Sequence, residues 1–189
     1  DVSVAGDEIV VTNGVYATGG RAVFGTMTNR VAVNKAIAVR SVNGPAFTII
    51  QGRQLAGTTN GNGAIRCVYL TNGAFLSGFT LTNGATRSTG DSDREQSGGG
   101  LWCVSTNASA SNCVMILNSA RINGGGAYSG KLIACTLLTN AAINGGGAYS
   151  PSASNNCILN NCTLTGNAAS SVGGGAADGI LNNCTLIGN

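Results

Sequence analysis

The second half of the chain repeats one short sequence four times, and this repeat limits the possible folds more than any other feature. Each copy runs from a cysteine to an asparagine five residues later, and the cysteines are 22, 27 and 22 residues apart. A Gly-Gly-Gly phrase recurs in step with them. A period in the low twenties with short apolar segments indicates a solenoid of stacked coils. The repeat positions are Cys113, Cys135, Cys162 and Cys184, with Asn118, Asn140, Asn167 and Asn189.

The spacing inside each repeat predicts strands rather than helices. No window carries apolar residues at i, i+3, i+4 and i+7 over three turns. Cys184 and Leu186 are two residues apart and therefore share one face of a strand. Leu181 lies three residues before Cys184, so both can point inward only if the chain bends at 182–183, where two asparagines tolerate a left-handed corner. We therefore predict an all-β chain, a parallel β-helix (β-solenoid) whose coils stack about 4.8 Å apart.

The first half of the chain carries weaker copies of the same plan. Residues 51–63 are polar and rich in glycine, so we expect them to leave the coil as a loop, and we expect the same of residues 86–97. Residues 64–83 return to the register, with Phe79 at the position that cysteine holds later. The prediction is one domain over residues 1–189 with about seven coils, which gives a rod about 30–35 Å long.

Charge and hydropathy exclude some partners. Charged residues make up only 9% of the chain, the net charge is +3, and the ten Lys and Arg residues are scattered, so no patch for nucleic acid is expected. No apolar run approaches 18 residues, so no membrane span is expected. The hydrophobic content of 43%, together with the periodicity, argues against disorder. No signal peptide is recognised, and we expect Asp1 to be a mature or trimmed end.

Three segments resemble a known family. Residues 6–16, 37–45 and 76–81 are similar to right-handed parallel β-helix proteins of the pectin-lyase-like superfamily, especially large secreted or surface-anchored bacterial repeat proteins. The later Leu-x-x-Asn and Gly-Gly-Gly-Ala phrases resemble repeats of chlamydial polymorphic outer-membrane proteins. The resemblance implies a right-handed coil and a place outside a bacterial cell or on its surface. It says little about activity, because this fold hosts lyases, hydrolases, adhesins and inert stalks.

The chain contains few residues that could support catalysis. It has no histidine, which excludes Ser-His and Cys-His nucleophile pairs and histidine-based metal sites. Its one acidic cluster is Asp91, Asp93 and Glu95, which we expect to be a solvated loop. The alternatives are a calcium site, because Asp-x-Asp-x-Glu offers hard oxygen ligands, or a catalytic group such as the lyases of the resembling family use. Calcium is thus the one candidate cofactor, and we expect no enzyme.

The four repeat cysteines should form one column inside the coil. Small buried thiols are the expected interpretation. Coils about 5 Å apart also place neighbouring cysteines within disulfide range, so one or two bridges between coils are an alternative. A metal ladder is disfavoured because no Cys-x-x-Cys pair is present. Seven cysteines are an odd number, so at least one thiol stays free or pairs between chains.

Two further sets of residues have a structural and a functional interpretation. Asn107, Asn161 and Asn183 begin Asn-x-Ser/Thr sequences, which carry glycan only in a suitable secreting host; corner residues are the simpler interpretation. Tyr128 and Tyr149 occupy one repeat position, with Trp102 near it. We expect these rings to stack along the rod. The alternative is a carbohydrate-binding strip, which would require rings that face solvent.

These observations favour an extracellular structural or adhesive module that associates end to end with itself. Its termini include no amphipathic segment to cover the first coil, and the last repeat ends in an open strand. The alternative is a carbohydrate-active enzyme or carbohydrate-binding module of the same fold, with a polysaccharide or cell-surface glycan as its partner. An acid-lined groove on one sheet would favour that alternative.

Overall fold

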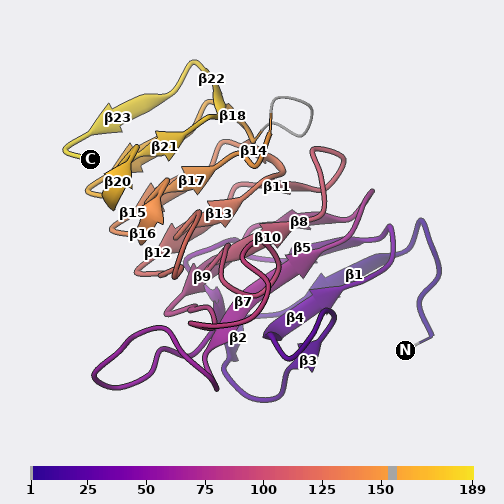
Figure 1. Ribbon diagram of the computed structural model, residues 1–189. Coiled ribbons are helices and arrows are strands. Elements are labelled where there is room, and N and C mark those ends of the chain that lie inside the picture. Colours follow the sequence, from indigo (N-terminus) through magenta and orange to yellow (C-terminus); the bar gives the residue numbers. More distant parts are fainter. Residues whose placement is uncertain (1, 153–156) are drawn as a thin grey trace.

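A computed structural model describes residues 2–152 and 157–189, and this part of the chain is a stack of β-coils without a helix (Figure 1). Three sheets of seven strands run along the stack, and a short two-stranded sheet lies beside them. Every strand pair of the three long sheets is parallel except β3 with β4. The predicted parallel β-helix of about seven coils is therefore confirmed.

Each coil contributes one strand to each long sheet, except that the first coil contributes two strands to sheet C and the last coil contributes none. Sheet A consists of β1 (Glu8–Val11), β5 (Ala38–Ser41), β8 (Phe75–Ser77), β11 (Ser109–Ser111), β14 (Lys131–Ile133), β18 (Ile158–Asn160) and β22 (Ile180–Asn182). Sheet B consists of β2 (Gly14–Tyr16), β6 (Thr48–Gln51), β9 (Thr80–Thr82), β12 (Val114–Ile116), β15 (Thr136–Leu138), β19 (Thr163–Thr165) and β23 (Thr185–Ile187). Sheet C consists of β3 (Arg21–Ala22), β4 (Thr28–Val33), β7 (Ile65–Leu70), β10 (Leu101–Cys103), β13 (Ala127–Tyr128), β17 (Ala148–Tyr149) and β21 (Ala176–Ala177). The short sheet pairs β16 (Ala141–Asn144) with β20 (Ala168–Val172).

The core is a set of apolar columns inside the coils. In most three-residue strands of sheets A and B the central residue is buried and its two neighbours are only half-buried, as strand alternation requires. In-register pairing then stacks each buried residue on its equivalent in the next coil. The column of sheet A is Ile9, Val39, Leu76, Ala110, Leu132, Leu159 and Leu181. The column of sheet B is Tyr16, Ile50, Leu81, Met115, Leu137, Leu164 and Leu186.

The corner between sheets A and B is a single residue in the left-handed region. Asn161 and Asn183 have φ values of 55° and 52°, which confirms the bend that the sequence predicted before Cys184. The equivalent residue of another coil is Ala134, with a φ of 50°. Alanine has no local preference for this conformation, which costs roughly 1–2 kcal/mol for an L-residue. The stacked coils on either side therefore impose the corner.

The Gly-Gly-Gly phrases lie where neighbouring coils approach most closely. A Cβ on Gly99 would be 2.2 Å from the carbonyl oxygen of Ser119, and one on Gly146 would be 2.3 Å from that of Ala168. Backbone cannot move aside as a flexible side chain can, so only glycine fits. The repeat of glycine is thus a steric requirement of the coil.

The repeat asparagines form a hydrogen-bonded ladder, in which Asn118, Asn140 and Asn167 are buried. The Oδ1 of Asn140 accepts hydrogen bonds from the backbone N–H and the Nδ2 of Asn118, at 3.0 and 3.1 Å. The Nδ2 of Asn140 in turn donates to the Oδ1 of Asn167 and to the carbonyl of Met115, both at 2.9 Å. Asn189 continues the ladder by accepting from Asn167. The side-chain amides therefore satisfy backbone groups at the second corner of each coil, where buried polar groups need partners.

The predicted cysteine column points into the core. Cys113, Cys135 and Cys162 are at most 2% exposed, and Cys184 at the last coil is partly exposed. All seven cysteines are free thiols in this structure, so no bridge joins the coils. Burial raises the pKa of Cys67 and of Cys157, which lie outside the column, to about 12. Such thiols are poor nucleophiles, which fits a packing role.

Candidate functional site

The outer face of sheet C carries a continuous stack of four aromatic rings. Strand pairing places Tyr69, Trp102, Tyr128 and Tyr149 at one position of four successive coils. Their ring centroids are 5.5, 5.8 and 5.9 Å apart, and adjacent planes differ by 11°, 4° and 21°. The rings therefore stack face to face along the rod, as predicted. Tyr69 adds one coil to the predicted stack.

Two segments pack over this stack on its outer side: residues 23–27, between β3 and β4, and residues 88–96. We call these two segments the cover. Phe24, in the segment between β3 and β4, packs edge-on against Tyr69 and Trp102 at 5.8 and 5.9 Å. The indole Nε1 of Trp102 donates a hydrogen bond to the carbonyl of Asp93 at 2.7 Å. Trp102 is 6% exposed and Tyr128 is 4% exposed.

The hypothesis of a carbohydrate-binding strip at Trp102, Tyr128 and Tyr149 required rings that face solvent. Trp102 and Tyr128 do not meet this condition, because stacking and the covering segments bury them. Tyr149, at the end of the stack, is half-buried. The hydrophobic gain from burying aromatic rings explains why the segments fold over them.

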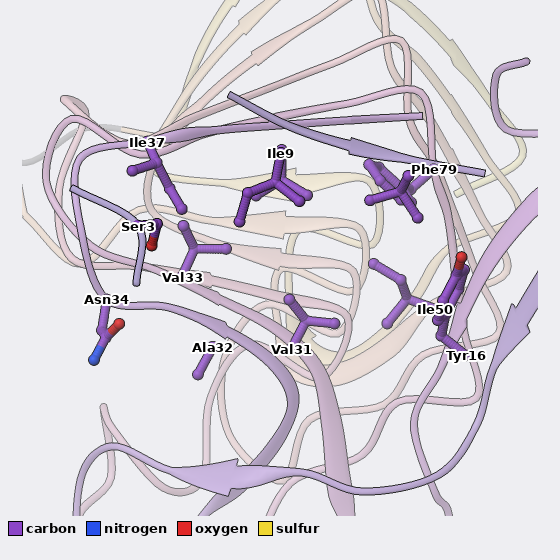
Figure 2. A pocket seen from close by; sticks show the side chains of 12 residues that line it. Ser3, Ile9, Tyr16, Val31, Ala32, Val33, Asn34, Ile37, Ile50 and Phe79 are labelled. Atoms are coloured by element: carbon purple, nitrogen blue, oxygen red, sulfur yellow. The ribbon is translucent and has the colours of Figure 1, made fainter. Parts of the chain in front are cut away.

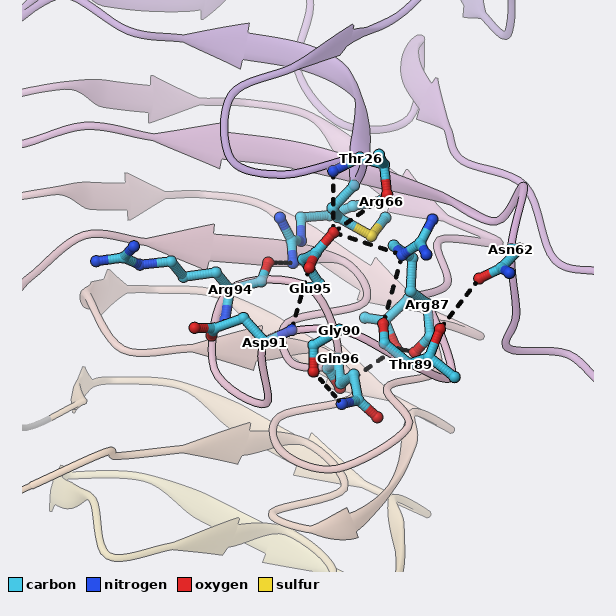
Figure 3. A network of polar contacts seen from close by, with 12 residues as sticks. Thr26, Asn62, Arg66, Arg87, Thr89, Gly90, Asp91, Arg94, Glu95 and Gln96 are labelled. Atoms are coloured by element: carbon cyan, nitrogen blue, oxygen red, sulfur yellow. Dashed lines mark hydrogen bonds and ion pairs between the residues drawn. The ribbon is translucent and has the colours of Figure 1, made fainter.

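The covering segments are joined by the carboxylate of Glu95. Its Oε1 accepts a hydrogen bond from the backbone N–H of Thr26 at 2.9 Å and pairs with the Nε of Arg87 at 3.4 Å (Figure 3). Its Oε2 accepts from the backbone N–H of Asp91 at 3.1 Å. These hydrogen bonds, that from Thr26 first, hold the pKa of Glu95 below its usual value of 4.5. The contact ties residues far apart in the sequence into one cover.

In the acidic cluster, the carboxylates of Asp91 and Glu95 accept hydrogen bonds from the protein itself. The Oδ1 of Asp91 accepts hydrogen bonds from the backbone N–H groups of Asp93 and Arg94, at 3.0 and 2.8 Å, so it closes a local turn. Glu95 is occupied by donors from other residues, as described above. In residues 2–152 and 157–189, no three Asp, Glu, Cys or His side chains are grouped so as to hold a metal ion. The calcium hypothesis for Asp91, Asp93 and Glu95 therefore finds no support, because the three carboxylates do not converge on one point in this loop.

Arg66, on β7, attaches segment 88–96 of the cover and the residues after it to the coil by hydrogen bonds. It was not identified from the sequence as a functional or structural site. It is 2% exposed, and its guanidinium donates to the carbonyls of Gly98, Ser97 and Arg94 at 2.7, 2.7 and 2.8 Å. A fourth bond, of 2.9 Å, goes to the side chain of Asn29. Burial lowers the pKa of Arg66 to about 9, which leaves it protonated at neutral pH. The sequence does contain a signal for this role, because Arg66 is the one charged residue in the otherwise apolar run 65–70.

We expect the stability of this cover to depend on pH through Glu95. Because the pKa of Glu95 is lowered in the folded protein, its contribution is present above 4.5 and is lost as the pH falls through the folded value. Glu95→Gln should therefore lower the melting temperature at pH 6, and the difference from the parent should shrink below pH 4.5. Melting curves between pH 3 and 7 measure this. Asp178→Asn, at an exposed carboxylate outside the network, is the control. A difference that does not change with pH would contradict the prediction.

The three Asn-x-Ser/Thr sites lie on the surface. Asn107 is exposed in a turn, and Asn161 and Asn183 are exposed at the corners described above. The Nδ2 of Asn183 donates to the Oδ1 of Asn161 at 2.6 Å. Asn161 and Asn183 therefore lie at corners, as expected, and glycosylation stays the alternative.

Two hollows differ in their chemistry. A cavity of about 300 Å³ opens at the first coil, and Figure 2 shows its mostly apolar side chains, including Ile9, Tyr16, Val31 and Ile50. A groove of about 470 Å³ lies beside β16 and is lined by small apolar residues, hydroxyl side chains, Asn60 and Arg121. Neither of these two has a carboxylate among its lining residues. A third hollow, beside β1, is lined by Asp7 and Glu8, and Glu8 pairs with Arg40 at 2.8 Å.

No protein-family model, curated protein or solved structure matches this chain. Within the described residues, no helix is long and apolar enough to cross a membrane. The parallel β-helix therefore rests on the geometry of the chain itself.

Proposed function

We propose that this chain is an extracellular structural or adhesive β-solenoid of the pectin-lyase-like superfamily, on a bacterial surface, and that its rods associate end to end. The observation that carries the proposal is that the two outermost coils of this 189-residue stack are complementary; what pairs with each edge is either a second copy, as we propose, or a further coil of a longer chain. In sheets A and B, β1 and β2 at one end and β22 and β23 at the other each pair on one side only. Such edges offer unpaired N–H and C=O groups to another chain.

The two ends are also apolar. At one end Leu186 and Ile187 are 51% and 54% exposed. At the other end Ile9, Tyr16 and Val15 are between 38% and 59% exposed, and the first two line the 300 Å³ cavity. Burial of this surface is favourable at roughly 25 cal/mol per Å².

The repeat register makes the two ends complementary. Leu186 ends the buried column that Tyr16 begins, and Leu181 ends the column that Ile9 begins. A second copy that added β22 to β1 and β23 to β2 would continue both columns. Each new ladder hydrogen bond stabilises the contact by about 0.5–1.5 kcal/mol and so offsets part of the free-energy cost of association. The contact is head-to-tail, so it propagates as a filament rather than closing.

Size-exclusion chromatography with light scattering over a concentration series tests this proposal. We expect the mass of the 189-residue chain to rise with concentration, and Leu186→Lys to keep it monomeric because a charge would enter the apolar contact. Leu117→Lys is the matched control, since Leu117 is also 51% exposed but lies at a corner inside the stack. A monomer at high micromolar concentration, or equal loss in both variants, would overturn the end-to-end contact.

A further inference from the structure

The outer face of sheet B is a regular array of threonine and aliphatic side chains. In five successive strands, the two residues that flank the buried one point outward and stack in register along the rod. We call this array the threonine face. One of its columns is Thr80, Val114, Thr136, Thr163 and Thr185, and the other is Thr82, Ile116, Leu138, Thr165 and Ile187.

The threonine face has a fixed two-dimensional repeat. Neighbouring strands place equivalent side chains about 4.8 Å apart along the rod, and residues two apart in a strand are about 6.6 Å apart across it. Nine of its ten residues are the β-branched Thr, Val and Ile. Such side chains are stiff at χ1, so the positions of their methyl and hydroxyl groups are set by the backbone.

The threonine face carries no charge and is open to solvent. Its residues in β12, β15 and β19 are half-buried, because the equivalent side chains of the neighbouring coils pack against them. Among the described residues, the hydroxyls of Thr136, Thr163 and Thr165 have no protein partner, so water is left to bond them. The outer face of sheet A differs, because it carries Glu8 and Lys131 among its residues.

We propose that the threonine face binds ice. Ice presents a neutral surface of water molecules with a short fixed repeat, and the threonine face is likewise neutral and repeats at a short fixed spacing. Stiff methyl groups at a constant spacing can hold water between them in an ordered layer, and the free hydroxyls can anchor that layer by hydrogen bonds. Approach to ice removes no charge from water, so no large desolvation penalty opposes binding.

The other regular surface ligand to consider is a crystalline polysaccharide. Its recognition favours aromatic rings laid flat against sugar rings, and the ten residues of the threonine face include none. The rings that the coil does stack belong to sheet C, where Trp102 and Tyr128 are buried. The proposal is independent of end-to-end association, because eight of the ten residues of the threonine face lie on strands inside the stack, β9, β12, β15 and β19.

Inhibition of ice recrystallisation by the purified chain tests the proposal. We expect ice grains held below freezing to stay small in micromolar protein, and fluorescently labelled protein to enter a slowly growing ice crystal. Thr136→Lys should abolish both effects, because a hydrated ammonium group in the middle of the face prevents flat contact. Thr136→Val should keep them, because Val114 and Ile116 already occupy the same face.

Ile133→Lys is the matched control, since Ile133 is an outward residue of sheet A in the same coil and should tolerate the charge. Thermal unfolding of each variant establishes that it is folded. Normal grain growth in the folded parent protein would overturn the proposal. So would equal loss in Ile133→Lys and Thr136→Lys, or a side-by-side dimer of the parent that only Thr136→Lys dissociates, which would make the face a contact between copies.

Discussion

Replacing Arg66 by methionine should lower the free energy of unfolding by about 3–5 kcal/mol, because four acceptors lose their donor. Methionine fills much of the same space but donates no hydrogen bond. The carbonyls of Gly98, Ser97 and Arg94 and the side chain of Asn29 would lose their common donor. Each buried acceptor left unsatisfied costs about 1–3 kcal/mol, partly offset because a buried charge is also removed.

Chemical denaturation of the two proteins measures this loss, and limited proteolysis locates it. Segment 88–96 should become the first cleavage site in Arg66→Met, since its attachment to the coil is weakened. Arg53→Met is the matched control, because Arg53 is exposed and, among the residues that the structure describes, its side chain bonds only the carbonyl of Gly63. A surface change of this kind is expected to cost about 0.5 kcal/mol or less. Equal stability of Arg66→Met and the parent would contradict the assigned role of Arg66.

Replacing Cys162 by aspartate should unfold the C-terminal coils. Cys162 is 1% exposed, and its column neighbours Cys135 and Cys184 offer no cation to pair with a carboxylate. A charged aspartate without a partner in this site would cost several kcal/mol of stability. A protonated aspartate would avoid the charge but would still bury a polar group with too few hydrogen-bond partners. Cys162→Ala removes only a small group and should cost about 1–2 kcal/mol.

Hydrogen exchange follows this effect coil by coil. In Cys162→Asp the strands from β18 onward should lose protection while β7 to β12 keep it, because each coil contacts only its neighbours. Cys184→Asp is the matched control, since Cys184 lies in the same column but is partly exposed at the last coil. Its effect should be clearly smaller. Unchanged melting of Cys162→Asp would mean that the column does not point inward.

The repeat itself determined the coil. Cys184 and Leu186 at a spacing of two, with Leu181 three residues before Cys184, placed the corner at 182–183, and the structure has its left-handed residue at Asn183. These signals are local, because strand alternation and corner geometry depend on neighbouring residues. The glycine phrases and the buried asparagines were equally visible, since every coil makes the same steric and hydrogen-bonding demands.

Only the tertiary structure decided what lies outside the coil. The sequence could place Trp102 and Tyr128 at one repeat position but could not show that Phe24 and the segment around Asp93 cover them. It likewise could not show that Thr26, 69 residues from Glu95, donates a hydrogen bond to the Glu95 carboxylate. Residues of a repeat see the same neighbours in each coil, so their environment can be read from the period. Residues in the covering segments contact distant parts of the chain once only, and no period reports a contact that occurs once.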